Sequence, residues 1–506
     1  MTQRADRLAG AAAVLLGGAA TVVLVLGGLE FGVLLYVLAA ICVAAVLTRF
    51  DAALTWCVVV VFGSIFLFQV DTIPIGLKAA FIGLSGILAV WAAASIARRM
   101  PALPARVRGG VKLALWAVGV IAAFLLWQLF TLLWNQVSIG SWLRDSLNYL
   151  LVPMVVLIGV EAGFRLSPRI VSALTLLAGL IGAYSYTVAW LGRRSLEQDA
   201  YQQFGLASSF VVFAALALCL ARFSSGRLRS IGWLVGALAL MGIMVVAGGR
   251  QTIVQCALAL LVAVSIGSGG MVAKSARVVA GLALAAVAFV VTLNVSSTSA
   301  DGVAVGRLEF FQRLQSNGLA AIYADQSAQA RLRALNWLIQ QWQQKPLLGW
   351  GFGHDMISVN TGQVATNVFT LDSPLVPLEK FGIVGTAVLV VALVLFFAAL
   401  WRIAGVPGGS RAGGSGVPGS RSVPGGPGRS AFGRVFCAVA TVLTLVTLVN
   451  GFPPENRGFP VFMLLLALAV VANTTAQGRG GGPAPDGRLR AAETAETSEP
   501  TAPVLR

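Results

Sequence analysis

The chain is dominated by a succession of apolar segments, each close in length to a membrane-spanning helix. A helix needs about 20 apolar residues to cross the hydrocarbon core of a bilayer. The candidate segments are 8–28, 31–48, 53–69, 74–97, 113–134, 148–163, 170–191, 205–222, 231–247, 252–268, 278–294, 374–401, 435–450 and 459–473. They predict an all-α fold, a polytopic transmembrane helical bundle of fourteen spans with a range of 12–14.

Composition excludes an ordinary soluble enzyme. Of the 506 residues, 58% are hydrophobic and 11% are charged, and the mean hydropathy is +0.86. Soluble domains carry about 25% charged residues. The net charge is +17, but no long stretch is both basic and soluble, so no nucleic-acid partner is expected. The expected surrounding is a lipid bilayer.

Basic residues gather in every second segment between the predicted spans, as in 98–112 and 222–229. Cytoplasmic segments of membrane proteins carry such an excess. This pattern places both termini in the cytoplasm and leaves the outer segments close to neutral. The apolar N-terminus is read as an uncleaved first span, because no convincing cleavage site follows it.

Cysteine and histidine limit the chemistry. The five cysteines lie inside apolar segments, without a Cys-x-x-Cys pair, and His354 is the single histidine. Small buried side chains are the expected role of these cysteines. Neither a metal site, a cofactor nor a His-pair mechanism is predicted.

The spans and polar segments divide the chain into six regions. Spans 1–11 occupy 1–294, and span 12 occupies 374–403. Spans 13–14 occupy 435–475. A large outer loop is 295–373, a Gly/Pro-rich cytoplasmic loop expected to be disordered is 404–434, and a polar tail of the same kind is 476–506.

The outer loop carries helical patterning. Apolar residues recur at helical spacing from Ser327 to Gln344, and a weaker pattern runs through 303–323. Such helices either lie on the membrane surface or cap the bundle. The segment Pro346 to Gly353 follows, and its glycines Gly349, Gly351 and Gly353 predict a sharp turn whose main-chain N–H groups a polar ligand could approach.

Arg250 stands in the shortest predicted outer turn, with no acidic residue nearby. A lone arginine there runs against the positive-inside tendency, which favours a functional role. The alternative is an arginine that reaches the lipid phosphates.

The order of these segments resembles the O-antigen ligase and polymerase superfamily of bacterial membrane enzymes, which move glycans off a polyprenyl diphosphate carrier. The similar stretches are SWLRDSLNYLLVP, AGGRQT, SAQARLRALNWLIQQWQQKPLLGWGFG and LDSPLVPLEKFGIVG, between about residues 140 and 390. The resemblance implies a glycan transferase in the bacterial cytoplasmic membrane. Its donor would be a polyprenyl diphosphate-linked glycan and its acceptor a hydroxyl of unspecified type.

The resemblance also implies which residues bind the diphosphate. Arg250 matches the first family arginine, and the second is Arg331 or Arg333, which face about 200° apart on a helix. Arg331 is favoured. Arginine stays protonated and binds phosphate oxygens through paired hydrogen bonds, so a metal is not required.

The sequence departs from the ligase pattern where ligases carry a histidine, because Leu371 and then Asp372 stand there. Asp372, Glu379 and His354 are the candidates for a general base. Asp372 could equally cap the next span with Ser373 beside it. Whether the enzyme is a ligase or a polymerase stays open.

Two other classes remain as alternatives. A flippase for lipid-linked glycans can also have about fourteen spans, but it should show two similar halves and broken helices at the midplane, and no such repeat is visible. A scaffold of an envelope-assembly complex could use its arginines to bind lipid phosphates alone.

Overall fold

The computed structural model describes residues 52–69, 75–192, 199–225, 231–247, 250–267, 316, 318, 326–357, 364–365, 373–405, 428–448 and 451–479. Within these ranges the chain is almost wholly helical. The only strands described are the two-residue pair β1 (Met356–Ile357) and β2 (Val364–Ala365), which run antiparallel.

Eleven of the fourteen predicted spans coincide with described helices. These are α3 (Ala52–Gln69), α4 (Ile75–Arg99), α5 (Ala105–Trp134), α6 (Ile139–Arg165), α7 (Pro168–Gly192), α8 (Asp199–Ser225), α9 (Ile231–Ala247), α10 (Arg250–Ile266), α15 (Val376–Ala404), α16 (Gly428–Leu448) and α17 (Phe459–Arg479). The predicted spans 8–28, 31–48 and 278–294 lie outside the described residues.

Five described helices are long and apolar enough to cross a membrane, namely α4, α5, α6, α15 and α16. Six further apolar helices are shorter over their described residues. These helices indicate a membrane-embedded protein, because about 20 apolar residues span the hydrocarbon core. The count of fourteen spans stays a prediction.

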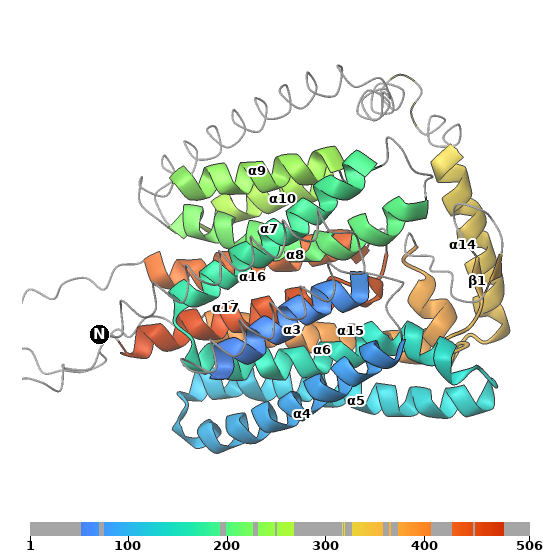
Figure 1. Cartoon of the computed structure of the whole chain (residues 1–506), viewed down its shortest axis with the longest axis horizontal. Coiled ribbons are helices and arrows are strands. Elements are labelled where there is room, and N and C mark those ends of the chain that lie inside the picture. The colour runs from blue at the N-terminus through green and yellow to red at the C-terminus, as the bar shows by residue number, and fades with distance from the viewer. Residues whose placement is uncertain are drawn as a thin grey trace, which may run out of the picture.

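The helices lie side by side along one long direction (Figure 1). α6 and α17 form the centre, and most residues of both are buried. Two glycines let them approach closely: a Cβ on Gly159 would meet the carbonyl oxygen of Leu464 at 2.7 Å, and one on Gly163 would meet Val471 at 2.6 Å. Small residues of this kind set the closest helix contacts in membrane bundles.

The bundle has two chemically different ends. At the end here called the basic end, α4 finishes with Arg98 and Arg99, and α6 finishes with Arg165. At the other, called the loop end, lie the start of α6, the start of α15 and the segment 345–357. The separation matches the predicted alternation of basic segments.

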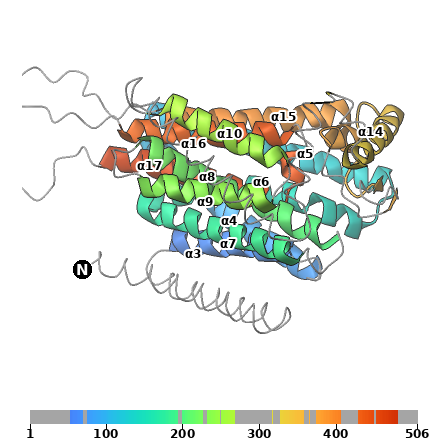
Figure 2. The ribbon, with the colours of Figure 1, turned by 90° about the horizontal axis from the view of Figure 1, so that it is seen from above.

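Helix α14 (Gln326–Gln344) lies across the loop end (Figures 1 and 2). It confirms the helix predicted for Ser327–Gln344. Leu338 is fully buried against Met356 and Val376, whereas Leu332 is exposed. α14 therefore caps the bundle through part of its apolar stripe. The weaker pattern at 303–323 falls almost entirely outside the described residues.

Candidate functional site

A buried ion cluster joins three distant segments at the loop end. Lys380 Nζ, near the start of α15, lies 2.6 Å from Asp145 Oδ1 on α6. The same ammonium lies 3.1 Å from Oε2 of Glu455, in the 3-10 turn η3 (Pro453–Glu455) between α16 and α17. All three side chains are at most 8% exposed. Charges this deeply buried need close partners to offset their lost hydration.

Further hydrogen bonds surround the two acids. Tyr149 donates its hydroxyl to Glu455 Oε1 at 2.6 Å, and the N–H of Gly353 donates to Asp145 Oδ2 at 2.9 Å. Asn148 donates to the main-chain carbonyl of Glu455 at 3.2 Å. Burial raises the pKa of the Glu455 carboxyl above its usual range. The cluster thus ties α6, α15, η3 and the glycine-rich turn into one unit.

The glycine-rich turn fits into a break in α15. Gly382 has φ +63° and ψ −171°, which interrupts the helix after its first turns. Across the break, Gly351 N–H donates to Lys380 O at 2.6 Å, and Ile383 N–H donates to Pro346 O at 2.9 Å. These bonds satisfy main-chain groups that the break would otherwise leave unpaired.

Glycine is required on both sides of this contact. Gly349, Gly351 and Gly353 have φ values of +68°, +83° and +80°. A Cβ on Gly349 would meet Lys380 O at 2.4 Å, and one on Gly382 would meet the carbonyl carbon of Leu347 at 2.3 Å. Positive φ and close backbone approach are the two conditions that only glycine tolerates.

The structure gives the turn a different role from the predicted one. Its glycines do form a sharp turn, but the N–H groups of Gly349, Trp350, Gly351 and Gly353 all donate to protein acceptors. Those four N–H groups are therefore not open to a ligand. The turn positions α15 and Asp145 instead.

Aromatic rings surround the buried charges. Phe352 packs edge-on against Phe381 at 4.9 Å and Tyr149 at 5.0 Å between ring centroids, and Phe124 packs on Phe381 at 5.0 Å. Such edge-to-face pairs are favourable packing geometries. They hold the ion cluster in an apolar, water-excluding surrounding.

Glu379 differs from the other acids. It is fully buried, and neither carboxylate oxygen accepts a hydrogen bond. His354 Nε2 lies 3.5 Å from Glu379 Oε1, and the His354 side chain is 22% exposed. The pair thus connects a buried carboxyl to the protein surface.

His354 is held in place by stacking. Its ring lies parallel to that of Trp350, with 4.4 Å between the ring centroids, and Lys345 Nζ lies 3.8 Å from the centroid of the same Trp350 ring. Lys345 also donates to Asn135 at 2.7 Å. Burial lowers the pKa of His354 to about 4, so its imidazole is neutral near pH 7. A neutral imidazole can accept a proton.

The predicted arginines lie on elements of this end. Arg250 begins α10, whose Gln255 donates to Thr447 on the last turn of α16 at 2.9 Å. Arg331 precedes Leu338 by two helical turns, so its backbone lies on the packed face of α14. The side chain of Arg333 is exposed. The side chains of Arg250 and Arg331 fall outside what the structure describes.

The proposed base Asp372 lies outside the described residues. Ser373, its neighbour, is described, and its hydroxyl accepts from the N–H of Leu375 at 3.2 Å. This bond lies in the turn before α15, whose N-cap residue Leu375 makes no side-chain capping hydrogen bond. The roles of Asp372 as cap or base remain predictions.

Sequence reasoning missed Asp145, Lys380 and Glu455 as a set. Asp145 and Lys380 each stand just before a long apolar run, where charges ordinarily mark the polar flank of a span. Glu455 follows Pro453 and Pro454 in a short turn. Each of these three residues is charged and lies in its own short stretch of sequence. No spacing along the chain indicates that they meet.

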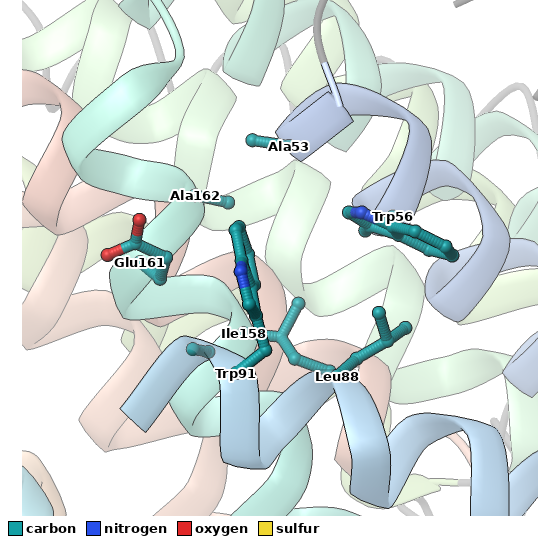
Figure 3. Close-up of a pocket in the computed structure, with 8 residues that line it drawn as sticks. Ala53, Trp56, Leu88, Trp91, Ile158, Glu161 and Ala162 are labelled. Atoms are coloured by element: carbon teal, nitrogen blue, oxygen red, sulfur yellow. The ribbon is translucent and has the colours of Figure 1, made fainter. Parts of the chain in front are cut away.

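A small hollow lies at the basic end, between α3, α4 and α6 (Figure 3). Trp56, Trp91 and Glu161 line it together with apolar side chains. Glu161 Oε1 accepts from Arg165 Nε at 2.7 Å and from Ser95 at 2.7 Å. The hollow is mainly apolar and its acid is paired, so the loop end carries the stronger candidate site.

Comparison with known proteins adds no identification. No family model, no curated protein and no solved structure matches this chain.

Proposed function

We propose that the protein is an integral membrane glycosyltransferase of the O-antigen ligase and polymerase type. It moves an oligosaccharide from a polyprenyl diphosphate carrier to an acceptor hydroxyl at the loop end. The acceptor oxygen forms the new glycosidic bond, the bond from the sugar to the diphosphate breaks, and the acceptor proton passes to the His354–Glu379 pair.

The observation that carries the proposal is this pair. A partly exposed neutral imidazole lies 3.5 Å from a buried carboxyl that makes no hydrogen bond. An acceptor hydroxyl needs a base within reach, and the base works best when a second group orients it or shares its proton. Asp372 remains the predicted alternative for the base.

Glycan transfer also needs positive charge near the leaving diphosphate, and the arginines supply it. Cleavage of a sugar–diphosphate bond develops negative charge on the leaving group, and fixed positive charge lowers that barrier. Arg250 and Arg331 belong to α10 and α14, which both have residues at the loop end. This common location supports their assignment to the diphosphate.

One observation favours the flippase alternative. Asp145 and Lys380 are buried charges within helices long enough to span a membrane, and such charges often mark transport pathways. Both lie near the beginnings of their helices, at the loop end, and both are paired. This geometry fits a fixed surface site better than a pathway through the bundle.

The decisive experiment measures glycan transfer by the purified protein in detergent, with a polyprenyl diphosphate-linked oligosaccharide as donor. A flippase needs a sealed compartment and gives no product in detergent. Product from the purified protein supports the transferase, whereas its absence under conditions that permit flipping in vesicles overturns the proposal.

Replacement of the arginines tests the site. Arg250→Ala should abolish transfer without reducing membrane insertion, because the leaving diphosphate loses its counter-charge. Arg98→Ala, an exposed arginine at the basic end, is the matched control and should retain activity. Arg331→Ala should cost far more activity than Arg333→Ala. Near-normal transfer by both Arg250→Ala and Arg331→Ala would refute the assignment.

A further inference from the structure

Glu379 is an acid without an adequate counter-charge. It is fully buried, and its two oxygens make no hydrogen bond. The adjacent Lys380 directs its ammonium to Asp145 and Glu455, at 2.6 and 3.1 Å. The ring nitrogen Nε2 of His354 lies 3.5 Å from Glu379 Oε1.

The buried cluster contains more acidic than basic side chains. With Asp145, Glu455 and Glu379 all ionised, three carboxylates would share the single ammonium of Lys380 in a fully buried region. An uncompensated buried charge is very costly, and such a group usually takes up a proton instead. Glu379 is the acid for which ionisation is least compensated, because Asp145 and Glu455 both have hydrogen-bond donors.

We propose that Glu379 is a proton-binding site that holds a proton at rest and exchanges it with the outside through His354. The proton site is inferred from the geometry of the cluster, whereas its effect on glycan transfer rests on the proposed function.

The exchange needs no other reactant. The O–H bond of the Glu379 carboxyl breaks, an N–H bond forms at His354 Nε2, and the resulting imidazolium gives up a proton to water at its exposed edge. The reverse sequence reloads the carboxyl. Because burial lowers the pKa of His354 to about 4, the imidazolium is short-lived near pH 7 and the imidazole acts as a carrier.

Several other groups face this site. Four elements contribute them: the 345–357 segment, α6, α15 and η3. Their titratable or charged side chains are Lys345, His354, Asp355, Asp145, Tyr149, Lys380 and Glu455. Among these described groups, His354 alone combines contact with Glu379 and partial exposure.

A pH dependence of transfer follows. The His354–Glu379 pair can take the acceptor's proton only after Glu379 has released its own. Transfer should therefore rise with pH through the neutral range, and the rise should disappear in Glu379→Gln.

Infrared difference spectroscopy of the purified full-length protein tests the proton site without any substrate. The C=O stretch of a protonated carboxyl is separate from the bands of carboxylates. The wild type should show this band at pH 7 and lose it at higher pH. Glu379→Gln should lack it, whereas Glu455→Gln and the basic-end control Glu161→Gln should retain it.

The outcomes separate the two proposals. A wild type without the band at pH 7, or a band that persists in Glu379→Gln, overturns the proton site. Should Glu379→Gln not fold, Glu379→Asp must shift the band frequency, and an unshifted band overturns the site equally.

His354→Gln should keep the band but slow its response to a pH jump at least tenfold; an unchanged rate refutes the relay. A confirmed band without any transfer in detergent refutes the proposed function alone.

Discussion

Two glutamates buried at opposite ends of the bundle have opposite surroundings. Glu161, at the basic end, is 1% exposed and lies near two guanidinium groups, those of Arg165 at 2.7 Å and Arg99 at 3.5 Å. Glu379, at the loop end, is fully buried, and its carboxylate makes no hydrogen bond. Arginines on regular helices compensate the charge of Glu161. Glu379 instead lies beside the break in α15 and the glycine-rich turn. The comparison shows that the basic end pairs its buried glutamate with cations, whereas the loop end leaves one buried carboxyl without a hydrogen bond.

The largest effect should come from removing the ammonium at the loop end. Lys380→Met leaves Asp145 and Glu455 without their cation, and a broken buried ion pair costs about 3–5 kcal/mol. Arg99→Met is the basic-end counterpart, and its side chain is 38% exposed, so we expect about 0–1 kcal/mol. Unfolding midpoints in detergent measure both. Equal losses would show that the two ends are stabilised alike.

The break in α15 should be the next most sensitive feature. Gly382→Ala forces a side chain into a backbone conformation that costs about 1–3 kcal/mol by itself, with a further clash against Leu347. Gly119→Ala on α5 is the control, because a Cβ there meets no atom within 4 Å. Thermal unfolding of both variants tests this, and a neutral Gly382→Ala would contradict the fitted contact between turn and helix.

Single hydrogen bonds to the acids give a smaller contrast. Tyr149→Phe removes a 2.6 Å bond to Glu455 Oε1, and bonds to charged groups contribute about 1.5–3 kcal/mol. Ser95→Ala removes a 2.7 Å bond to Glu161, but that oxygen keeps Arg165, so we expect about 0.5–1 kcal/mol. Denaturant titration of the two variants compares them. A larger loss for Ser95→Ala would reverse the ranking of the ends.

The smallest expected effect is a loss of folding stability in acid. It should arise at the loop end, because His354 is the only histidine in the chain. Its ordinary pKa is 6.5 and its folded pKa is about 4, so the unfolded chain binds more protons between these values. Stability is full above pH 6.5 and falls as pH drops towards 4. We expect a contribution on the order of 1–2 kcal/mol after solvent screening.

His354→Gln should flatten the pH dependence of the unfolding midpoint in this window. Glu161→Gln, the basic-end control, should leave the His354 contribution in place. An unchanged slope in His354→Gln would show that the histidine is not buried in the folded protein as the structure has it.

The helices could be read from the sequence because each depends on local properties. Eleven predicted spans coincide with described helices, and the helix predicted for Ser327–Gln344 coincides with α14. Even the Glu161–Arg165 pair follows from a spacing of four residues, which puts both side chains on one face of a helix. The sharp turn at Gly349, Gly351 and Gly353 was readable for the same reason.

The loop-end cluster could not be read in this way. Lys380 is 235 residues from Asp145 and 75 from Glu455, so no spacing relates them. His354 and Glu379 were both considered as bases, but their contact was not foreseeable. The N–H groups of the glycine turn were predicted to be open to a ligand because three of their four acceptors lie on the distant helices α15 and α6.

The sequence by itself determined that this chain forms long apolar helices and where its backbone must turn sharply. Hydropathy and glycine conformation act over one helix or one turn, so neighbouring residues suffice to reveal them. Only the tertiary structure decided which charges meet. Burial of Asp145, Lys380, Glu455 and Glu379 depends on how α6, α15 and η3 pack together, and a buried charge is defined by its partners in space.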